Sequence, residues 1–413
     1  MNLYLFLDND KVSTTYGIGT YLKELTNAVV GTDIKVHIVY LHSIHQNFTI
    51  EKSNHIEHWF IPEIRHNNQS KDIIRQINDY HSNVFYLLRF YIKESDNLIF
   101  HFNQNHYGLL AKELKKQYNC KTVATIHFAS YGFDILGSFQ KLRTIKAKFE
   151  KQRSEAEQEI YIKDEKDCAL FNEVDRMITP TQYMKNILHI EYQVELEKIA
   201  VIPNGLNDAK QIQLQDRENL RKKWRIPEEE FIILFVGRLS VVKGLRFLIE
   251  AFRKVLVEYP NCRLMIAGNG KYERYIQNTK DLCTKITFTG FLDKEEVYEL
   301  YQISNVGVVP SLFEPFGYVA VEMMIHKLPI IATSNSGLNE VIDDSCGLKV
   351  PIIELSDRRE IDSTLLAQNI IHLLQHPVKA KTMGENGRKR YLQKFSSEVF
   401  RRNILNYYNS LYI

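Results

Sequence analysis

Two glutamates stand in a segment that joins a predicted strand to a predicted helix. Glu314 and Glu322 are separated by seven residues, and the apolar run Asn305–Val309 before them ends at Pro310. Because Gly317 favours a helix start, we expect Glu314 in the loop and Glu322 more than one turn into the helix. Carboxylates accept hydrogen bonds from sugar or ribose hydroxyls. The alternative is an exposed Glu314 and an ordinary helical Glu322.

Backbone N–H groups at the start of that helix could receive a phosphate, because the first turn leaves them without partners inside the helix. The groups concerned are those of Phe316, Gly317 and Tyr318.

Two cations follow another apolar run, Phe231–Val236. Gly237 and Arg238 come directly after it, and Lys243 lies five residues beyond Arg238. Arginine presents a planar fork of donors and lysine a point charge, which together suit the two phosphates of one ligand. Solvated surface cations at a strand end are the alternative interpretation.

A glycine-bearing turn follows the first apolar run of the chain, Leu3–Leu7. Gly17 and Gly19 precede a helical pattern, and glycines there let an anion approach the backbone at a helix N-terminus. A purely structural turn is the alternative. A dinucleotide site also needs a third glycine and an acidic residue closing the second strand. That strand, Val36–Leu41, runs into His42, so NAD is not expected.

Metal ligands are not predicted anywhere in the chain, and neither is a cofactor. Asp8-Asn9-Asp10 superficially matches the acidic pair of metal-dependent transferases, but it stands where the glycine loop begins, and we interpret it as loop polarity. His42 and His45 have a loose resemblance to metal ligands, with no evident partner.

The elements that must position these residues form an α/β pattern. Short apolar runs alternate with stretches of helical period, which indicates parallel sheets buried on both faces. The eleven runs are too many for one compact doubly wound sheet, so we predict two domains. They are Leu3–Leu7, Val36–Leu41, Leu98–Phe102, Thr122–Ile126, Arg176–Thr179, Ile199–Ile202, Phe231–Val236, Arg263–Ala267, Ile286–Phe288, Asn305–Val309 and Pro329–Ala332.

A domain boundary fits after Gly205, where a polar segment precedes the next apolar run. We predict one domain over residues 1–205 and a second over residues 206–395. The stretch 396–413 repeats aromatic residues at helical spacing, and we expect it to form a helix that crosses back onto the first domain.

The composition of the chain limits the classes of partner that the protein is expected to bind. The 413 residues carry a net charge of +3, which does not point to nucleic acid. Five widely spaced cysteines and the lack of a secretory or membrane-spanning run favour a soluble cytoplasmic protein. The basic amphipathic stretch Phe139–Arg153 is predicted to be a packed helix. Contact with anionic lipid at the inner membrane face, or with an acidic acceptor, is the alternative.

Taken together, these pieces resemble the retaining glycosyltransferases of the large GT4 family, of GT-B architecture. The matching motifs occur in the family's order along nearly the whole chain. They are Gly17-Ile18-Gly19, Thr125-Ile126-His127, Ile202-Pro203-Asn204-Gly205, Gly237-Arg238-Leu239 with Lys243-Gly244, Ala267-Gly268-Asn269-Gly270, Thr289-Gly290-Phe291, Glu314–Glu322, Ala332-Thr333 with Ser336-Gly337, and Glu340. One departure is Ser336, which stands where the family usually has glycine.

The resemblance implies two Rossmann-like doubly wound domains that face each other across a cleft, with a nucleotide sugar as donor. It implies that Arg238 and Lys243 hold the diphosphate, that Glu322 binds the ribose, and that Glu314 lies near the donor sugar. His127 would face that sugar from the acceptor side. The remaining residues it places on the donor are Gly17, Gly19, Asn204, Gly237, Gly290, Phe291, Phe316, Gly317 and Tyr318.

The resemblance also implies transfer to an acceptor hydroxyl with retained anomeric configuration and without a metal. A glycan, a lipid-linked saccharide, a small molecule or a peptide all remain as acceptors. Fixed cations and helix N-termini could replace a metal, because they stabilise the charge that grows on the leaving diphosphate. Two alternatives stay open, a non-catalytic GT-B partner subunit and a nucleotide-sugar epimerase.

Overall fold

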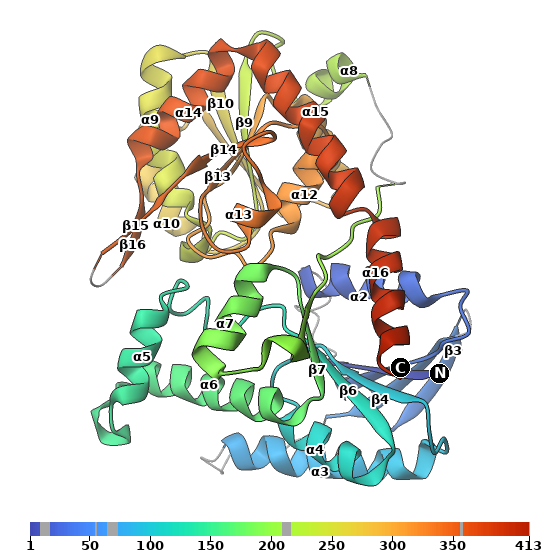
Figure 1. Ribbon diagram of the computed structural model, residues 1–413. Coiled ribbons are helices and arrows are strands. Elements are labelled where there is room, and N and C mark those ends of the chain that lie inside the picture. Colours follow the sequence, from blue (N-terminus) through green and yellow to red (C-terminus); the bar gives the residue numbers. More distant parts are fainter. Residues whose placement is uncertain (9–16, 54–55, 64–72, 209–215, 356–357, 413) are drawn as a thin grey trace. The chain divides into compact units, whose positions relative to one another are not determined.

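The computed structural model describes residues 1–8, 17–53, 56–63, 73–208, 216–355 and 358–412. The chain divides into two compact units (Figure 1). Unit 1 comprises Met1–Gly205 with Phe400–Ile413, and unit 2 comprises Leu206–Val399. From the sequence, we predict the boundary between the two domains after Gly205 and a C-terminal helix, from residue 396, that crosses back onto the first domain.

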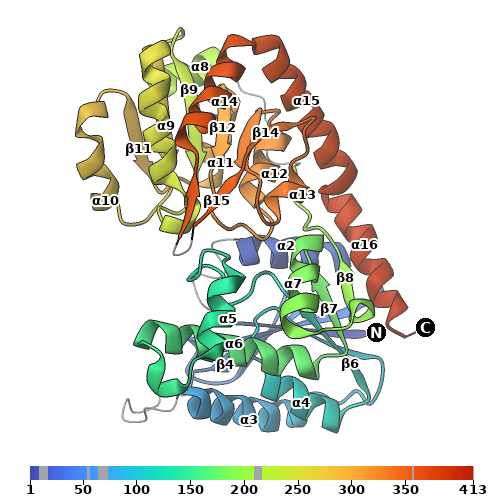
Figure 2. The same cartoon turned by 60° about the vertical axis from the view of Figure 1, so that its left-hand side comes forward.

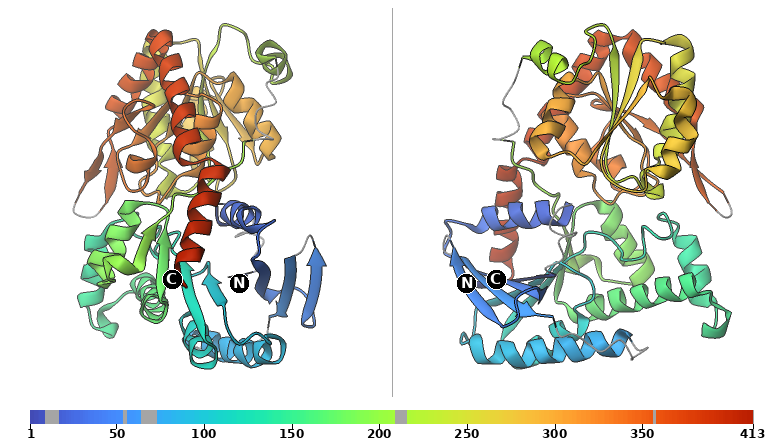
Figure 3. Two further views of the ribbon diagram at one scale, coloured as in Figure 1. Left: turned by 45° about the vertical axis from the view of Figure 1, so that its right-hand side comes forward. Right: turned by 180° about the vertical axis from the view of Figure 1, so that it is seen from behind.

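Unit 1 is built on an eight-stranded sheet of order β3-β4-β2-β1-β5-β6-β7-β8. All neighbours pair in parallel except β3 and β4, which form an antiparallel edge. The strands are β1 (Asn2–Asp8), β2 (Lys35–Ser43), β3 (Thr49–Ser53), β4 (Ile56–Pro62), β5 (Leu98–Phe102), β6 (Cys120–Thr125), β7 (Arg176–Thr179) and β8 (Ile199–Val201). The left view of Figure 3 shows the blue strands of this sheet side by side.

Helices cover both faces of that sheet. Along β1, Tyr4 and Phe6 belong to the core that the sheet forms with α3 (Ile73–Tyr91), α4 (Gly108–Gln117), α6 (Glu155–Glu173) and α7 (Gln182–Tyr192). On the other face lie α2 (Gly17–Val29) and α16 (Ser397–Ser410). His101 of β5 bonds the hydroxyl of Tyr408 at 2.6 Å, which ties α16 to the sheet. Residues 307 positions apart in the sequence are therefore in direct contact.

Unit 2 has a six-stranded parallel sheet of order β11-β10-β9-β12-β13-β14. The chain runs outward from β9 to β11 and then returns to the other side of β9, so the connections change direction between β9 and β12. The strands are β9 (Phe231–Val236), β10 (Cys262–Ala267), β11 (Ile286–Gly290), β12 (Val306–Val309), β13 (Ile330–Thr333) and β14 (Gly347–Val350). Strands β15 (Ile352–Glu354) and β16 (Arg359–Ile361) form a separate antiparallel pair, labelled in Figure 1.

The helices of unit 2 lie on both faces of its sheet. Helices α9 (Leu245–Glu258) and α14 (Ser363–Gln375) lie side by side (Figure 2). The opposite face packs against α8 (Arg217–Lys223), α11 (Lys294–Ile303), α12 (Tyr318–Ile325), α13 (Leu338–Val341) and α15 (Pro377–Lys394). Short helical turns complete the unit: η3 (Val241–Lys243), α10 (Glu273–Ile276) and η4 (Gln277–Leu282).

The eleven apolar runs predicted as strands are all strands, and their ends agree with the described strands to within two residues. Five further strands were not predicted: β3, β4, β14, β15 and β16. Strand β3 has the sequence TIEKS and is largely exposed, so it carries no apolar run to detect. It forms because its backbone pairs with β4 at the edge of the sheet.

The predicted helix over Phe139–Arg153 is wrong at its C-terminal end. Helix α5 spans Phe139–Ala147, and a short turn, η1 (Glu150–Gln152), follows. The guanidinium of Arg153 donates hydrogen bonds to the carbonyls of Ile145 at 3.2 Å and Lys148 at 2.8 Å. These contacts satisfy carbonyl groups at the end of the helix.

The cations of this stretch are used largely within unit 1. Lys146 pairs with the buried Asp164 at 2.8 Å, and Arg143 pairs with Glu191 at 2.6 Å. Leu142 is buried, as the packed-helix interpretation expects. Phe149, which lies within the stretch predicted to be a packed helix, is instead 78% exposed beyond the helix end. Among the residues that the structure describes, no helix is long and apolar enough to cross a membrane.

Candidate active site

The loops that follow β9 and β12 are joined at the carboxyl edge of the unit 2 sheet. The N–H of Leu312 donates to the carbonyl of Val242 at 2.7 Å. Gly244 has a φ of 67°, and a Cβ there would overlap the carbonyl oxygen of Pro310. Only glycine fits this approach. In open α/β sheets, ligands bind outside the carboxyl ends of the strands where the connections change direction, and these two loops occupy that place.

Lys243 and Glu314 form an ion pair across these two loops. Lys243 ends the turn η3 and Glu314 lies in the loop before α12, so the prediction of a loop position for Glu314 is confirmed. Their side chains are 18% and 14% exposed. The ion pair therefore fixes both side chains in a site mostly removed from water.

Ser336 holds the backbone of Glu314. Its hydroxyl accepts a hydrogen bond from the N–H of Glu314 and donates one to its carbonyl, both at 2.9 Å. Ser336 has a φ of 48°, a left-handed conformation that is unfavourable for a residue with a side chain. The departure from glycine at this position therefore adds two contacts that orient the Glu314 loop.

Glu322 lies in the second turn of α12, as predicted, and it accepts a hydrogen bond from the hydroxyl of Tyr301 at 2.8 Å. Burial raises the pKa of Glu322, while the bond from Tyr301 opposes that rise. Tyr301 bonds Oε2, and no donor to Oε1 is found among the described residues, so Oε1 is available for a ligand hydroxyl.

The start of α12 presents backbone N–H groups at the same edge of the sheet. Gly317 has a φ of 98°, and Tyr318 begins the helix. Phe316 is buried in the unit 2 core, so it could reach a ligand only through its backbone. Gly237 and Arg238 directly follow β9 and precede Lys243 in the sequence, and the side chain of Arg238 is exposed.

Two further predicted donor residues follow β11. Gly290 ends that strand with a φ of 81°, and its carbonyl accepts a hydrogen bond from the N–H of Gly268 at 2.9 Å. The side chain of Phe291 is 63% exposed, and an exposed aromatic face is available for stacking against a nucleobase.

His127 of unit 1 follows β6, and its ring packs edge-on against Tyr21 with centroids 4.6 Å apart. Burial lowers the pKa of His127 to about 3. The imidazole is therefore neutral at pH 7. Its Nε2 atom has no hydrogen-bond partner among the described residues, so it could bond a ligand without contributing charge.

The remaining predicted residues of unit 1 lie at two places in the structure. Gly17 and Gly19 form the first turn of α2. Asn204 is buried, and in the described part of the chain its Oδ1 atom lacks a hydrogen-bond partner. Asn9 and Asp10 lie outside the described residues.

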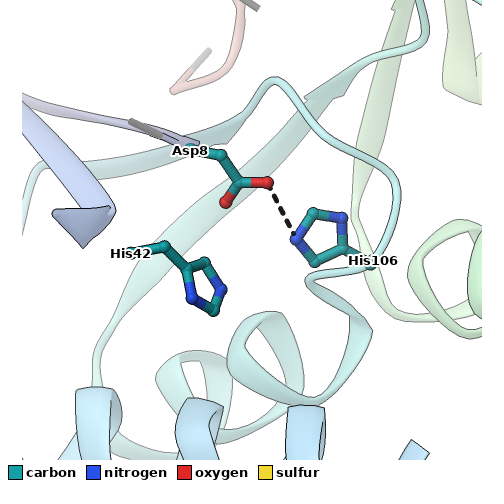
Figure 4. A group of neighbouring side chains, drawn as sticks. All are labelled: Asp8, His42 and His106. Atoms are coloured by element: carbon teal, nitrogen blue, oxygen red, sulfur yellow. Dashed lines mark ion pairs between the residues drawn. The ribbon is translucent and has the colours of Figure 1, made fainter. Parts of the chain in front are cut away.

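A cluster of chemically active side chains in unit 1 was not predicted. Asp8, His42 and His106 each offer one ligand atom, and these atoms lie within 4.8 Å of one another (Figure 4). In the sequence, His42 has no evident partner and His45 is its nearest candidate. The position of these residues in the sequence could have identified the cluster, because Asp8 ends β1, His42 lies near the end of β2 and His106 follows β5.

Comparisons with known proteins agree with this architecture. Residues 15–210 match the family model for glycosyltransferase family 4, and residues 216–390 match that for glycosyl transferases group 1. An uncharacterized glycosyltransferase of Methanocaldococcus jannaschii is 35% identical over 176 residues, which are 40% of this chain and 44% of that protein. The mannosylfructose-phosphate synthase of Agrobacterium fabrum is 25% identical over 295 residues, 68% of this chain and 62% of that protein. The chain spans about half the length of the curated relatives it matches.

Among solved structures, the sucrose-phosphate synthase from Thermosynechococcus elongatus has a TM-score of 0.74 at 23% identity. The match covers 100% of this chain and 99% of that one. The predicted family and the GT-B fold class are thereby confirmed. With a family 4 domain followed by a group 1 domain on two doubly wound units, the chain belongs to the family 4 glycosyltransferases of GT-B fold.

Proposed function

We propose that this chain transfers a sugar from a nucleoside-diphosphate sugar to an acceptor hydroxyl, with retention of anomeric configuration and without a metal ion at the diphosphate. The observation that carries the proposal lies in unit 2. Lys243 and Glu314 meet at the switch point of its sheet, close in sequence to Arg238 and to the start of α12.

The leaving group of such a reaction gains negative charge as the glycosidic bond breaks. Lys243, Arg238 and the N–H groups at the start of α12 supply fixed positive potential for that charge. Because this potential stabilises the transition state more than the ground state, it contributes to rate. In this scheme Glu322 accepts a hydrogen bond from the ribose, and Glu314 accepts one from the donor sugar.

The acceptor proton needs a destination. We propose a front-face reaction in which the departing phosphate takes that proton, while the neutral ring of His127 hydrogen-bonds the donor sugar. A neutral imidazole suits this role because it adds no charge beside the developing oxocarbenium ion. A covalent sugar adduct trapped on a carboxylate would contradict the front-face scheme.

A thermal-shift screen of UDP-, GDP- and ADP-sugars tests donor binding. The donor that fits should raise the melting temperature by mass action. Lys243→Ala and Glu322→Ala should each abolish that shift. Lys223→Ala is a matched control, because Lys223 also pairs with a glutamate in unit 2 but lies on α8. If both site variants keep the full shift, the donor site is assigned wrongly.

A further inference from the structure

Four strand ends of unit 1 bring chemically active side chains to one edge of its sheet. Asp8 ends β1, His42 lies near the end of β2, His106 follows β5, and Glu63 follows β4. The strands are neighbours in the order β4-β2-β1-β5, and they pair in parallel. The chain changes direction between β1 and β5, so this edge is the switch point of unit 1, where α/β sheets bind ligands.

The spacing of the ligand atoms approaches that of a chelate. Asp8 Oδ2 and His106 Nε2 are 3.3 Å apart, and all three ligand atoms lie within 4.8 Å of one another. Ligands bound tetrahedrally to Zn²⁺ at 2.0–2.1 Å are separated by about 3.3 Å. Asp8 and His106 therefore already stand at chelate spacing, and His42 needs only a small side-chain shift. Figure 4 shows the three side chains directed toward a common space.

Surrounding side chains hold the three candidate ligands in place. Tyr107 donates a hydrogen bond from its hydroxyl to Asp8 Oδ1 at 2.5 Å. The ring of His42 stacks on Tyr80 with centroids 4.1 Å apart. The ring of His81 lies parallel to that of His106, with centroids 5.9 Å apart. Such outer contacts orient the ligands of protein metal sites.

Two local features near the cluster are energetically unfavourable in the absence of a bound ligand. His42 has a φ of 52°, and the pairing of β2 with β4 shifts register between Tyr40 and Ser43, which redirects the His42 side chain. His81 is fully buried, and both of its ring nitrogens lack hydrogen-bond partners among the described residues. A buried imidazole without partners indicates a bound group or water close by.

The cluster borders a cavity. Asp8, His42 and His106 line a cavity of about 600 Å³, together with Glu63, Lys163 and Lys166. Three protein ligands beside such a cavity leave coordination positions for an exchangeable ligand, as in catalytic rather than structural zinc sites. Two imidazoles with one carboxylate select a divalent transition metal over Mg²⁺ or Ca²⁺, which prefer oxygen ligands throughout.

We propose that Asp8, His42 and His106 form a binding site for a divalent transition metal ion such as Zn²⁺. The site lies in unit 1, whereas the residues proposed to bind the donor diphosphate lie in unit 2. The inference is independent of the proposed function, because metal binding is measured directly and without any sugar donor.

The test measures Zn²⁺ bound per chain by calorimetry and by elemental analysis after desalting. We expect one equivalent in the wild-type chain and at least a 100-fold weaker affinity in His42→Gln and His106→Gln. His45→Gln is the matched control, since His45 lies three residues from His42 but stacks on Phe60 outside the cluster. It should bind Zn²⁺ as the wild type does, and excess Mg²⁺ should not compete.

Visible absorption of the Co²⁺-loaded chain gives a second reading. Its bands should be lost in His106→Gln and kept in His45→Gln. Tyr107→Phe removes only an orienting contact, and we expect it to weaken Zn²⁺ affinity by about 10- to 100-fold. Circular dichroism verifies that each variant is folded. The proposal is overturned if the wild type binds no stoichiometric Zn²⁺, or if folded His42→Gln and His106→Gln bind it unchanged, in which case Asp8 and His106 form a plain ion pair.

Discussion

Replacing Lys243 with methionine, alone and together with Glu314→Gln, separates the contribution of Lys243 to stability from its contribution to binding. The substitution keeps the length of the side chain and removes the charge that faces Glu314. The two side chains are 18% and 14% exposed, so Glu314 would be left as a nearly buried charge without its partner. Breaking a buried pair costs 3–5 kcal/mol, and we expect about 3 kcal/mol here because some exposure remains.

Binding of nucleoside diphosphate should fall at the same time. A hydrogen bond to a charged group contributes about 1.5–3 kcal/mol, which corresponds to a loss of about 10- to 150-fold in affinity. The double variant Lys243→Met/Glu314→Gln removes both charges. It should regain most of the stability, since no unpaired charge remains, and it should not regain the affinity.

The assay follows the two quantities separately. Trp224 lies in unit 2 and Trp59 in unit 1, and these are the two tryptophans of the chain. In a Trp59→Phe background, fluorescence during urea unfolding therefore reports on unit 2. Calorimetry with UDP, GDP and ADP measures affinity.

The control is Lys223→Met, which breaks a pair between α8 and α11 and should leave affinity unchanged. If the double variant binds the diphosphate as tightly as the wild type, Lys243 serves only to neutralise Glu314 and the reasoning fails.

Three further predictions concern stability. Ser336→Ala removes both hydrogen bonds to the Glu314 backbone and should lower the free energy of unfolding of unit 2 by about 1–3 kcal/mol, measured in urea titrations. Ser336→Gly should lower this free energy by less, because glycine tolerates the φ of 48° at this position. Gly244→Ala should destabilise unit 2 by about 2 kcal/mol or more, and a melting temperature equal to the wild type would contradict the described loop. Burial lowers the pKa of His101 to about 3, so the unfolded chain takes up its proton first and unit 1 should lose stability as pH falls from 6.5 toward 3. His101 by itself contributes at most about 1.4 kcal/mol per pH unit to this loss, and His101→Gln should reduce the slope of unfolding free energy against pH.

Much of unit 2 could be predicted because its strands are short, apolar and buried on both faces. Runs such as Phe231–Val236 and Asn305–Val309 identify the strands, and the residues that follow them must then share one edge of a parallel sheet. The positions of Glu314 and Glu322 follow from Pro310 and Gly317, which end the strand and start the helix.

Contacts between distant parts of the chain could not be predicted in the same way. The partner of Lys243 lies 71 residues away, and nothing in the local pattern around either residue identifies the other. At the end of α5, Arg153 folds back and donates hydrogen bonds to the carbonyls of Ile145 and Lys148, a contact that the local pattern does not reveal. His106 was missed because the sequence around it carries no motif, although it follows a well-predicted strand, β5.

The most direct test of the account is nucleoside diphosphate release from a panel of UDP-, GDP- and ADP-sugars in the presence of EDTA. With water and a panel of hydroxyl acceptors, the wild-type chain should turn over one class of donor and form products with the anomeric configuration of the donor, read by proton NMR. Lys243→Met/Glu314→Gln should be inactive although it is folded. Absence of turnover with every donor, or equal turnover by that folded double variant, would contradict the account.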